Sequence, residues 1–164
     1  MKKIFSTIIT FLLFSSLLFG AGKYKMIISD NASGKLDINI ATREEMLRSG
    51  VAESYVNKII SFRDIKGGIE NIDELENING IGKKTCEKLK KYFFIENIPN
   101  IKPLYINKAD DKILSYYGFN KKEIKTIRKF LEKNKKIKNN IMLKNIISKN
   151  KYEKYKDIIK YDVY

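Results

Sequence analysis

Short amphipathic segments separated by glycines recur along this chain. Val56 and Ile59 belong to an apolar series with spacings of three and four, which predicts a helix that ends at Gly67-Gly68. Before it, Thr42 and Glu45 form a capping-box pattern, which predicts the start of another short helix. The chain after residue 35 is therefore predicted to begin with two helices joined by a tight turn.

A second pair of helices is predicted directly after the first. Asn71 and Glu74 again form a capping-box pattern, and Cys86, Leu89 and Phe93 share one apolar stripe of a last helix. Beyond the apolar run at the N-terminus, no segment alternates apolar and polar residues as a strand would. The fold class predicted from these patterns is all-α.

The four-helix pattern occurs twice. When the sequence is shifted by 68 positions against itself, residues 36–93 align without a gap with residues 104–161, and 14 of the 58 positions are identical. Most identities fall on apolar or glycine positions, which indicates two copies of one unit. Helix starts in the second copy are predicted at Asp110, Asn120 and Asn139. We expect domains at 36–95 and 103–162, the second a degenerate copy of the first.

The N-terminus has the pattern of an export signal. Two lysines precede an apolar run from Ile4 to Phe19, and small residues follow it. The run has 16 residues, fewer than the roughly 20 that span a bilayer comfortably. We therefore expect residues 1–22 to be a cleaved signal peptide rather than a membrane anchor. The mature chain is then expected outside the cytoplasm, in the periplasm or cell envelope, without a stable membrane span.

Composition narrows the chemistry. The chain has 33 Lys and Arg against 19 Asp and Glu, one Cys and no His. Without histidine, a Ser-His-Asp triad and a histidine metal site are excluded, and a single cysteine forms no internal disulfide. The carboxylates form no pair or cluster with the spacing of a metal-assisted hydrolase. We therefore predict no catalytic residue, no metal site and no cofactor, in a protein that is not an enzyme.

The net charge of +14 is concentrated in the second copy. Residues 36–93 hold ten basic and ten acidic side chains, whereas residues 100–164 hold eighteen and seven. Such an excess favours a polyanionic partner, either nucleic acid or an anionic membrane surface. A lysine-rich composition along the whole chain would give the same excess without any anion binding, so charge by itself leaves both interpretations open.

The strongest candidate site is the segment Gly80-Ile81-Gly82-Lys83-Lys84-Thr85. Two glycines around one apolar residue allow a tight turn whose backbone can approach another surface closely. The helix predicted to begin there has amide groups without partners at its positive end, where an anion is favoured. Lys83 and Lys84 add charge, and Thr85 adds a hydroxyl donor. The segment is predicted to hold a sugar-phosphate backbone with Ile81 facing inward, and a plain turn between packed helices is the alternative.

The other turns carry weaker versions of this pattern. The first turn has alanine where the second glycine would stand, the third has one glycine followed by two lysines, and the fourth, residues 148–151, has no glycine. The fourth turn is either a solvated surface turn or a nonspecific phosphate contact. From the first and third turns we add to the candidate DNA-binding residues Gly50, Val51, Ala52, Ser54, Lys121 and Lys122.

Three segments of the first copy resemble a known family. They are Leu36-Asp-Ile-Asn-Ile-Ala, Ile59-Ile-Ser-Phe-Arg and Ile72-Asp-Glu-Leu-Glu-Asn-Ile-Asn-Gly-Ile-Gly-Lys-Lys-Thr, and they look like the tandem helix-hairpin-helix domain of the ComEA family. The resemblance covers about residues 36–95, and the second copy shares it only through the repeat. It implies an exported bacterial protein that binds double-stranded DNA without sequence preference and takes part in DNA uptake.

The predicted architecture is thus a tandem helix-hairpin-helix module followed by a second, degenerate helix-hairpin-helix-like repeat. Two functions from different classes remain open at this point. The first is binding of double-stranded DNA outside the cytoplasm through its phosphate backbone. The alternative is an extracytoplasmic protein-interaction module without DNA binding, whose hairpins are packing scaffolds and whose basic face docks an envelope protein.

Overall fold

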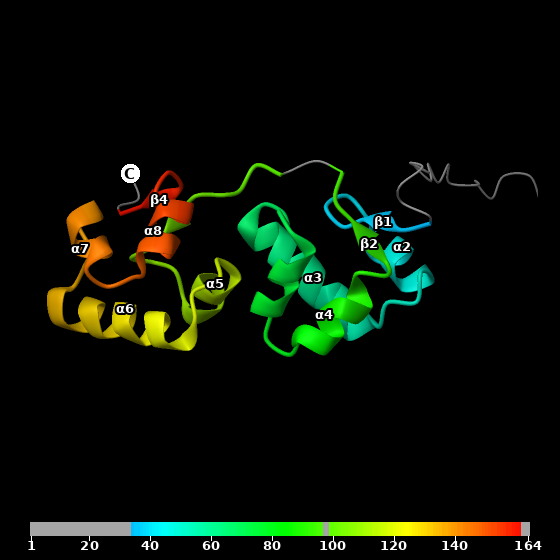
Figure 1. The fold of residues 1–164 in the computed structure, drawn as a ribbon, viewed down its shortest axis with the longest axis horizontal. Coiled ribbons are helices and arrows are strands. Elements are labelled where there is room, and N and C mark those ends of the chain that lie inside the picture. The colour runs from blue at the N-terminus through cyan, green and yellow to red at the C-terminus, as the bar shows by residue number, and fades with distance from the viewer. Residues whose placement is uncertain (1–33, 97–98, 162–164) are drawn as a thin grey trace, which may run out of the picture. The chain divides into compact units, whose positions relative to one another are not determined.

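The computed structural model describes residues 34–96 and 99–161, and the signal peptide expected at residues 1–22 lies outside them. None of the helices formed by the described residues has the length and apolar character needed to cross a membrane. These residues are mainly helical, as predicted, and they form two similar halves (Figure 1).

The first half follows the predicted order of helices. Its elements are α2 (Arg43–Arg48), α3 (Glu53–Lys66), the 3-10 helix η2 (Ile72–Asn77) and α4 (Lys83–Leu89). Thr42 and Glu45 form the predicted capping box at the start of α2. The end of α3 is also confirmed, because Gly67 adopts a left-handed conformation there, which glycine does without strain.

The second half repeats this order with α5, α6, α7 and α8. Their bounds are Asp111–Tyr116, Lys121–Asn134, Asn140–Lys144 and Lys149–Tyr155. The predicted helix starts are confirmed, since Asp110, Asn120 and Asn139 each accept a hydrogen bond from a backbone amide in the first turn of α5, α6 and α7. Local cap chemistry therefore sets where these helices begin.

Each half is also closed by a pair of parallel strands that the sequence patterns did not predict. β1 (Leu36–Asp37) pairs with β2 (Phe93–Phe94), and β3 (Leu104–Tyr105) pairs with β4 (Ile159–Lys160). Two residues are too few to show an alternating pattern. The placement of Phe93 on the last helix is wrong, because α4 ends at Leu89 and Phe93 lies in β2, where it is still buried.

The repeat extends to individual hydrogen bonds. The side-chain amide of Asn39 donates to the carbonyl of Ile69 over 3.0 Å and accepts from the Ile69 amide over 2.8 Å. Asn107 makes the same two bonds with Ile137, over 2.9 and 2.8 Å. Both residues of the second pair stand 68 positions after their counterparts. The alignment is therefore confirmed over this part of the repeat.

The 68-residue register fails before the last helix. The N-cap residues of α4 and α8 are Gly82 and Ser148, which are 66 positions apart. Two residues are therefore missing from the second copy between its third and fourth helices. The gapless alignment, which places Ser148 opposite Gly80, is wrong there. In the observed register, buried Tyr152 and Tyr155 replace buried residues of α4.

Each half has its own hydrophobic cluster, and side chains of α5 connect the two halves. Tyr116 of α5, in the second half, packs into the cluster of the first, where its ring lies edge-on to Phe62 with 4.8 Å between ring centroids. The neighbouring Ser115 hydroxyl donates to the carbonyl of Asn77 over 2.8 Å. α5 is thereby attached to both α3 and η2.

The segment between the halves packs against the end of α3. The backbone amide of Lys102 donates to the carbonyl of Lys66 over 2.8 Å, and the Tyr117 hydroxyl donates to the carbonyl of Lys102, also over 2.8 Å. A Cβ on Gly68 would lie 2.3 Å from the Cβ of Pro99. The glycine therefore leaves the space through which this segment passes.

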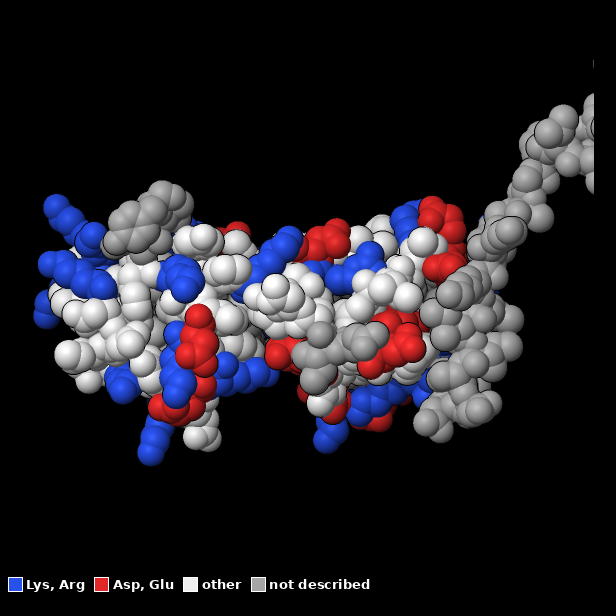
Figure 2. Space-filling view, turned by 90° about the horizontal axis from the view of Figure 1, so that it is seen from above, with Lys and Arg blue, Asp and Glu red and all other residues white. Residues whose placement is uncertain are grey.

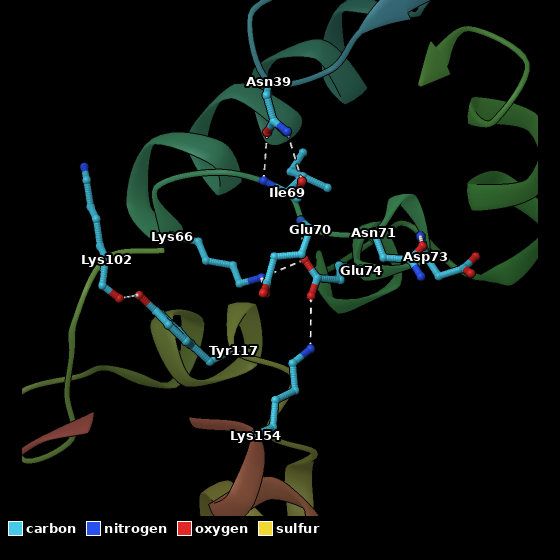
Figure 3. Close-up of polar contacts among 10 residues, drawn as sticks. All are labelled: Asn39, Lys66, Ile69, Glu70, Asn71, Asp73, Glu74, Lys102, Tyr117 and Lys154. Carbon is cyan, nitrogen blue, oxygen red and sulfur yellow. Dashed lines mark hydrogen bonds and ion pairs between the residues drawn. The ribbon is translucent and has the colours of Figure 1, made fainter. Parts of the chain in front are cut away.

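Lys66 is fully buried, and its ammonium group is paired twice. It donates to the carboxylates of Glu70 over 2.8 Å and Glu74 over 2.6 Å. The other carboxylate oxygen of Glu74 lies 3.2 Å from the ammonium of Lys154 on α8 (Figure 3). Burial by itself would raise the pKa of the Glu74 carboxyl, but the two ammonium groups hold that pKa below its ordinary value.

The capping box predicted from Asn71 and Glu74 is therefore wrong. Asn71 does cap η2, but it accepts from the amide of Asp73 over 2.9 Å, and Glu74 accepts from the amide of Glu70 over 3.2 Å instead of closing the box. Glu74 turns inward because the buried Lys66 ammonium needs a partner, and a buried unpaired charge costs far more than a lost cap.

We expect Lys66→Met to lower the free energy of unfolding by about 3 kcal/mol, because it leaves the buried Glu74 carboxylate without its nearest partner. Urea denaturation at pH 7 measures this change. Lys108→Met is the control, since Lys108 is exposed and surface substitutions usually change stability by about 0.5 kcal/mol or less. Equal effects of the two substitutions would contradict the structural role of the pair.

The contribution of Glu74 should also depend on pH. Because its pKa is lower in the folded than in the unfolded state, its stabilisation is present above the unfolded glutamate pKa of about 4.3 and disappears as the pH falls through the folded pKa. We expect the difference in unfolding free energy between the wild type and Glu74→Gln to shrink between pH 7 and acid. A difference that stays constant with pH would show that the charge is unimportant.

Candidate nucleic-acid interface

The second hairpin, residues 78–82, connects η2 to α4. Ile81 is buried, with 2% of its surface exposed, as predicted. Gly80 has φ +85°, a conformation that side-chain-bearing residues rarely adopt, and a Cβ there would lie 2.6 Å from Nζ of Lys58. That ammonium donates to the carbonyl of Asn79 over 3.0 Å. The buried side chain of Ile81 and the hydrogen bond from Lys58 therefore hold this hairpin in place.

Gly82 plays a different part from Gly80. Its φ of −89° suits any residue, and a Cβ there would meet no atom within 4 Å. Gly82 is the N-cap of α4 and provides no side-chain cap, so the first amides of this helix have no side-chain acceptor. The fold does not need glycine at this position. The free space lies directly in front of free amide groups, which is the arrangement that a closely approaching anion requires.

The remaining residues of the candidate segment lie in the first turn of α4. Lys83 and Lys84 are exposed, and neither ammonium group has a hydrogen bond or an ion pair with any described residue. Thr85 is partly buried, and its backbone amide donates to the carbonyl of Gly82 over 2.9 Å. The ammonium groups of Lys83 and Lys84 and the backbone amides without a side-chain acceptor thus lie together at the start of α4.

The first hairpin, residues 49–52, has the same shape. Gly50 has φ +96° and Val51 is buried, in the positions that Gly80 and Ile81 hold in the second hairpin. Ala52 is the N-cap of α3 and, like Gly82, provides no side-chain cap. The first half therefore has two helix starts whose amide groups are left without a side-chain acceptor.

The acidic residue that follows the first hairpin forms a local ion pair. Glu53 follows Ala52 in the first turn of α3, and its carboxylate forms an ion pair with Arg43 of α2. Ser54 lies next to it and is exposed. The negative charge that would oppose an approaching phosphate is thus partly compensated.

The hairpins of the second half differ at the helix starts. The side chain of Asn120 accepts from the amide of Glu123 over 2.9 Å at the start of α6, and the hydroxyl of Ser148 accepts from the amide of Lys151 over 3.4 Å at the start of α8. These caps use amide groups that an anion would otherwise contact. The hairpins of the second half thus supply their own acceptors where those of the first half do not.

The two lysines predicted in the second half are only partly brought to the second hairpin. Lys121 and Lys122 are exposed in the first turn of α6. Lys121 lines a groove that also contains Gly80 and Gly82, whereas Lys122 does not. Sequence patterns gave no sign of Lys58, which holds the second hairpin, because it stands 21 residues before the carbonyl that it binds.

One cluster of metal-ligating side chains occurs in the described part of the chain. Donor atoms of Asp73, Glu76 and Cys86 lie within 4.8 Å of one another. The Cys86 thiol donates to the carbonyl of Ile72 over 3.3 Å, and burial raises the pKa of this thiol. Asp73 pairs with Lys90 over 2.6 Å. Two of the three groups thus already have partners within the protein, and a thiol kept protonated is a poor metal ligand.

Charge differs between the two halves on the face shown in Figure 2. Lysine and arginine gather over the second half, whereas both signs are mixed over the first. This matches the uneven distribution of charged residues along the sequence. The net positive charge that attracts a polyanion is therefore on the second half, whereas the helix starts without a side-chain cap are those of α3 and α4 in the first.

The segment that carries both open hairpins matches a known motif. The model of the helix-hairpin-helix motif matches residues 31–94. A stretch of 64 residues is 41% identical to ComE operon protein 1 of Bacillus subtilis strain 168 and covers 38% of this chain and 31% of that protein. An uncharacterised protein of Haemophilus influenzae is 38% identical over 58 residues, which are 34% of this chain and 52% of that protein.

A stretch of 57 residues is also 32% identical to the human endonuclease/exonuclease/phosphatase family domain-containing protein 1. It covers 34% of this chain but only 10% of the human protein. The chain spans about a third and about half of the lengths of the Bacillus and Haemophilus relatives. The similarity in each case therefore concerns a short module and not a whole protein.

The two glycines of the second hairpin should respond differently to substitution. We expect Gly80→Ala to lower the free energy of unfolding by about 1 kcal/mol, because alanine is strained at positive φ. Gly82→Ala should change it by only a few tenths of a kcal/mol, since its φ and open space suit alanine and the restriction of the unfolded chain offsets the poorer N-cap. Urea denaturation of both variants measures the difference, and equal losses would contradict the separate roles of these glycines.

Proposed function

We propose that this protein binds double-stranded DNA through its phosphate backbone, without reading the base sequence. The match of residues 31–94 to the helix-hairpin-helix motif and the similarity to ComE operon protein 1 support this proposal. One strand contacts the second hairpin, where Gly80, Gly82, Lys83, Lys84 and Thr85 meet. Backbone amides and lysines contact phosphate oxygens, which are the same at every base pair, so the contacts carry affinity but no sequence preference.

The observation that carries this proposal is the open start of α4. Gly82 has no side-chain cap and no neighbour where its Cβ would be, and Lys83 and Lys84 have no partners among the described residues. A helix start used only for packing would be better stabilised by a capping side chain, as Ser148 provides in the second half. Glycine at this position makes sense when another molecule supplies the acceptor.

The first hairpin supports the second. Its buried Val51, its Gly50 turn and its uncapped Ala52 reproduce the geometry of the second hairpin within one module. We propose that the amides beyond Ala52, with Ser54, contact another part of the phosphate backbone. The alanine methyl group and the nearby Glu53 make this contact weaker than that of the second hairpin, because they restrict approach and add negative charge.

We further propose that the protein acts outside the cytoplasm. The basis is the signal-peptide pattern of residues 1–22, a charged start followed by an apolar run and small residues. The ComEA resemblance implies DNA uptake during natural transformation as the setting. Binding by the phosphate backbone suits that role, since DNA from any source has to be accepted.

The alternative is a protein-interaction module that does not bind DNA. The observation that favours it is the capping of both hairpin helices of the second half by Asn120 and Ser148, which leaves these hairpins as packing elements. The basic surface of that half would then dock an acidic envelope protein.

The two functions are distinguished by Gly82→Ser, which copies the cap found at Ser148. The substitution should leave the free energy of unfolding unchanged or raise it by about 0.5 kcal/mol, because serine caps a helix well. Its hydroxyl and Cβ would stand where a phosphate approaches, so we expect weaker binding of a labelled random 20-base-pair duplex in fluorescence anisotropy. Asn145→Ser, at an exposed position outside both hairpins of the first half and with a negative φ, is the control. Unchanged DNA binding by a folded Gly82→Ser variant would exclude the second hairpin as the contact.

A further inference from the structure

A large open groove lies between the second hairpin and the helices α5 and α6. Its volume is about 1440 Å³. Gly80 and Gly82 line one side, and Lys112, Lys121 and Lys125 line the other. The hairpin proposed to hold a phosphate backbone therefore faces basic side chains that come from the second half of the chain. We call this space the hairpin groove.

The side chains that line the hairpin groove carry a net positive charge. Its acidic side chains are Glu76 and Asp111, and Asp111 is paired with Arg128 over 2.6 Å. The two lysines of α6 that line the groove, Lys121 and Lys125, have no hydrogen bond or ion pair with any described residue. They stand four positions apart and so lie on one face of the helix. Two unpaired cations thus face the same space as the second hairpin.

The other two lysines of the groove are held in place. Lys58 donates to the carbonyl of Asn79, and Lys112 donates to the hydroxyl of Ser61 over 3.3 Å. Neither hydrogen bond is an ion pair, because both acceptors are uncharged oxygens. The two lysines therefore add to the positive potential of the groove without being free to leave it.

The two sides of the groove are attached to each other. The Ser115 hydroxyl of α5 donates to the carbonyl of Asn77, which directly precedes the second hairpin. The ring of Tyr116 packs edge-on against Phe62 of α3. The spacing between α6 and the hairpin is thus set by packing, so a ligand that touches the hairpin meets the α6 lysines without a rearrangement.

We propose that the hairpin groove is a second contact site for the DNA held by the second hairpin, in which Lys121 and Lys125 contact phosphates of the same molecule. This inference rests on the proposed function and extends the footprint into the second half. The groove is open, and its free cations are exposed rather than buried. Such a surface suits a long phosphate backbone, whose charges are spread out, better than a small anion, which needs a buried set of donors.

The second half would then contribute to DNA binding in a way that its own hairpins do not. Their helix starts are capped by Asn120 and Ser148. The contribution comes instead from the exposed face of α6, which the fold turns toward the hairpin of the first half. In this proposal the second half of the chain therefore forms the other side of a single DNA-binding site.

The test is the salt dependence of binding by the full mature chain. The double variant Lys121→Ala/Lys125→Ala is titrated with a labelled random 20-base-pair duplex at several salt concentrations. Each phosphate contact contributes about 0.9 to the slope of log affinity against log salt concentration, so loss of two contacts should reduce the slope by about 2. Alanine favours helix, so α6 should persist, and circular dichroism checks this.

A matched control is available on the same helix. Lys129→Ala/Lys133→Ala removes the same charge at the same spacing from exposed positions that do not line the hairpin groove. This variant should change the slope by well under 1. A wild-type slope in the groove variant, or equal reductions in both variants, would overturn the proposal, because the groove lysines would then act only through overall charge or not at all.

Lys83→Ala/Lys84→Ala separates this inference from the proposed function. If that variant loses affinity and the groove variant does not, DNA binding stands and only the groove proposal fails. If the wild-type chain does not bind the duplex at any salt concentration, the proposed function fails and the groove proposal fails with it. Slope reductions of about 2 in both variants, with little change in the control, support a shared site.

Discussion

The buried ammonium group of Lys66 is the constraint on which the rest of the structure depends. Removing a lysine from water costs several kcal/mol unless carboxylates accompany it, so the chain after α3 must return Glu70 and Glu74 to this point. That return sets the position of η2, and the second hairpin follows η2 directly. Because Glu74 also binds Lys154 of α8, one cluster of charges orients the hairpin and attaches the second half to it.

Local signals predicted most of the fold. Helix starts at Thr42, Asp110, Asn120 and Asn139 were recognisable because a cap and its amide lie within three residues. The inward turn of Glu74 was not, because it depends on a charge eight residues away that only becomes buried in the folded chain. The strand pairs were missed for a similar reason, since each joins residues more than fifty positions apart and is only two residues long.

The sequence predicted the contiguous part of the candidate site but not the residues that the fold brings to it from elsewhere in the chain. The sequence placed Gly80 through Thr85 together because they are contiguous, and it correctly expected Ile81 to face inward. It could not distinguish a glycine required by its φ angle from one that leaves space for a ligand, which is the difference between Gly80 and Gly82. Nor could it bring Lys121 and Lys125 to this hairpin, because that depends on the packing of α5 against the first half.

The strand pairs have a topological consequence. In each copy the first residues, Leu36–Asp37 or Leu104–Tyr105, lie beside the last, Phe93–Phe94 or Ile159–Lys160. The chain thus enters and leaves each unit at one edge, so another unit can be appended through a short connection without disturbing the interior, as with domains whose termini are close together. Tandem duplication of the unit is therefore compatible with this fold. The loops of a duplicated unit can change in sequence, because the paired strands at its two ends still hold the unit together.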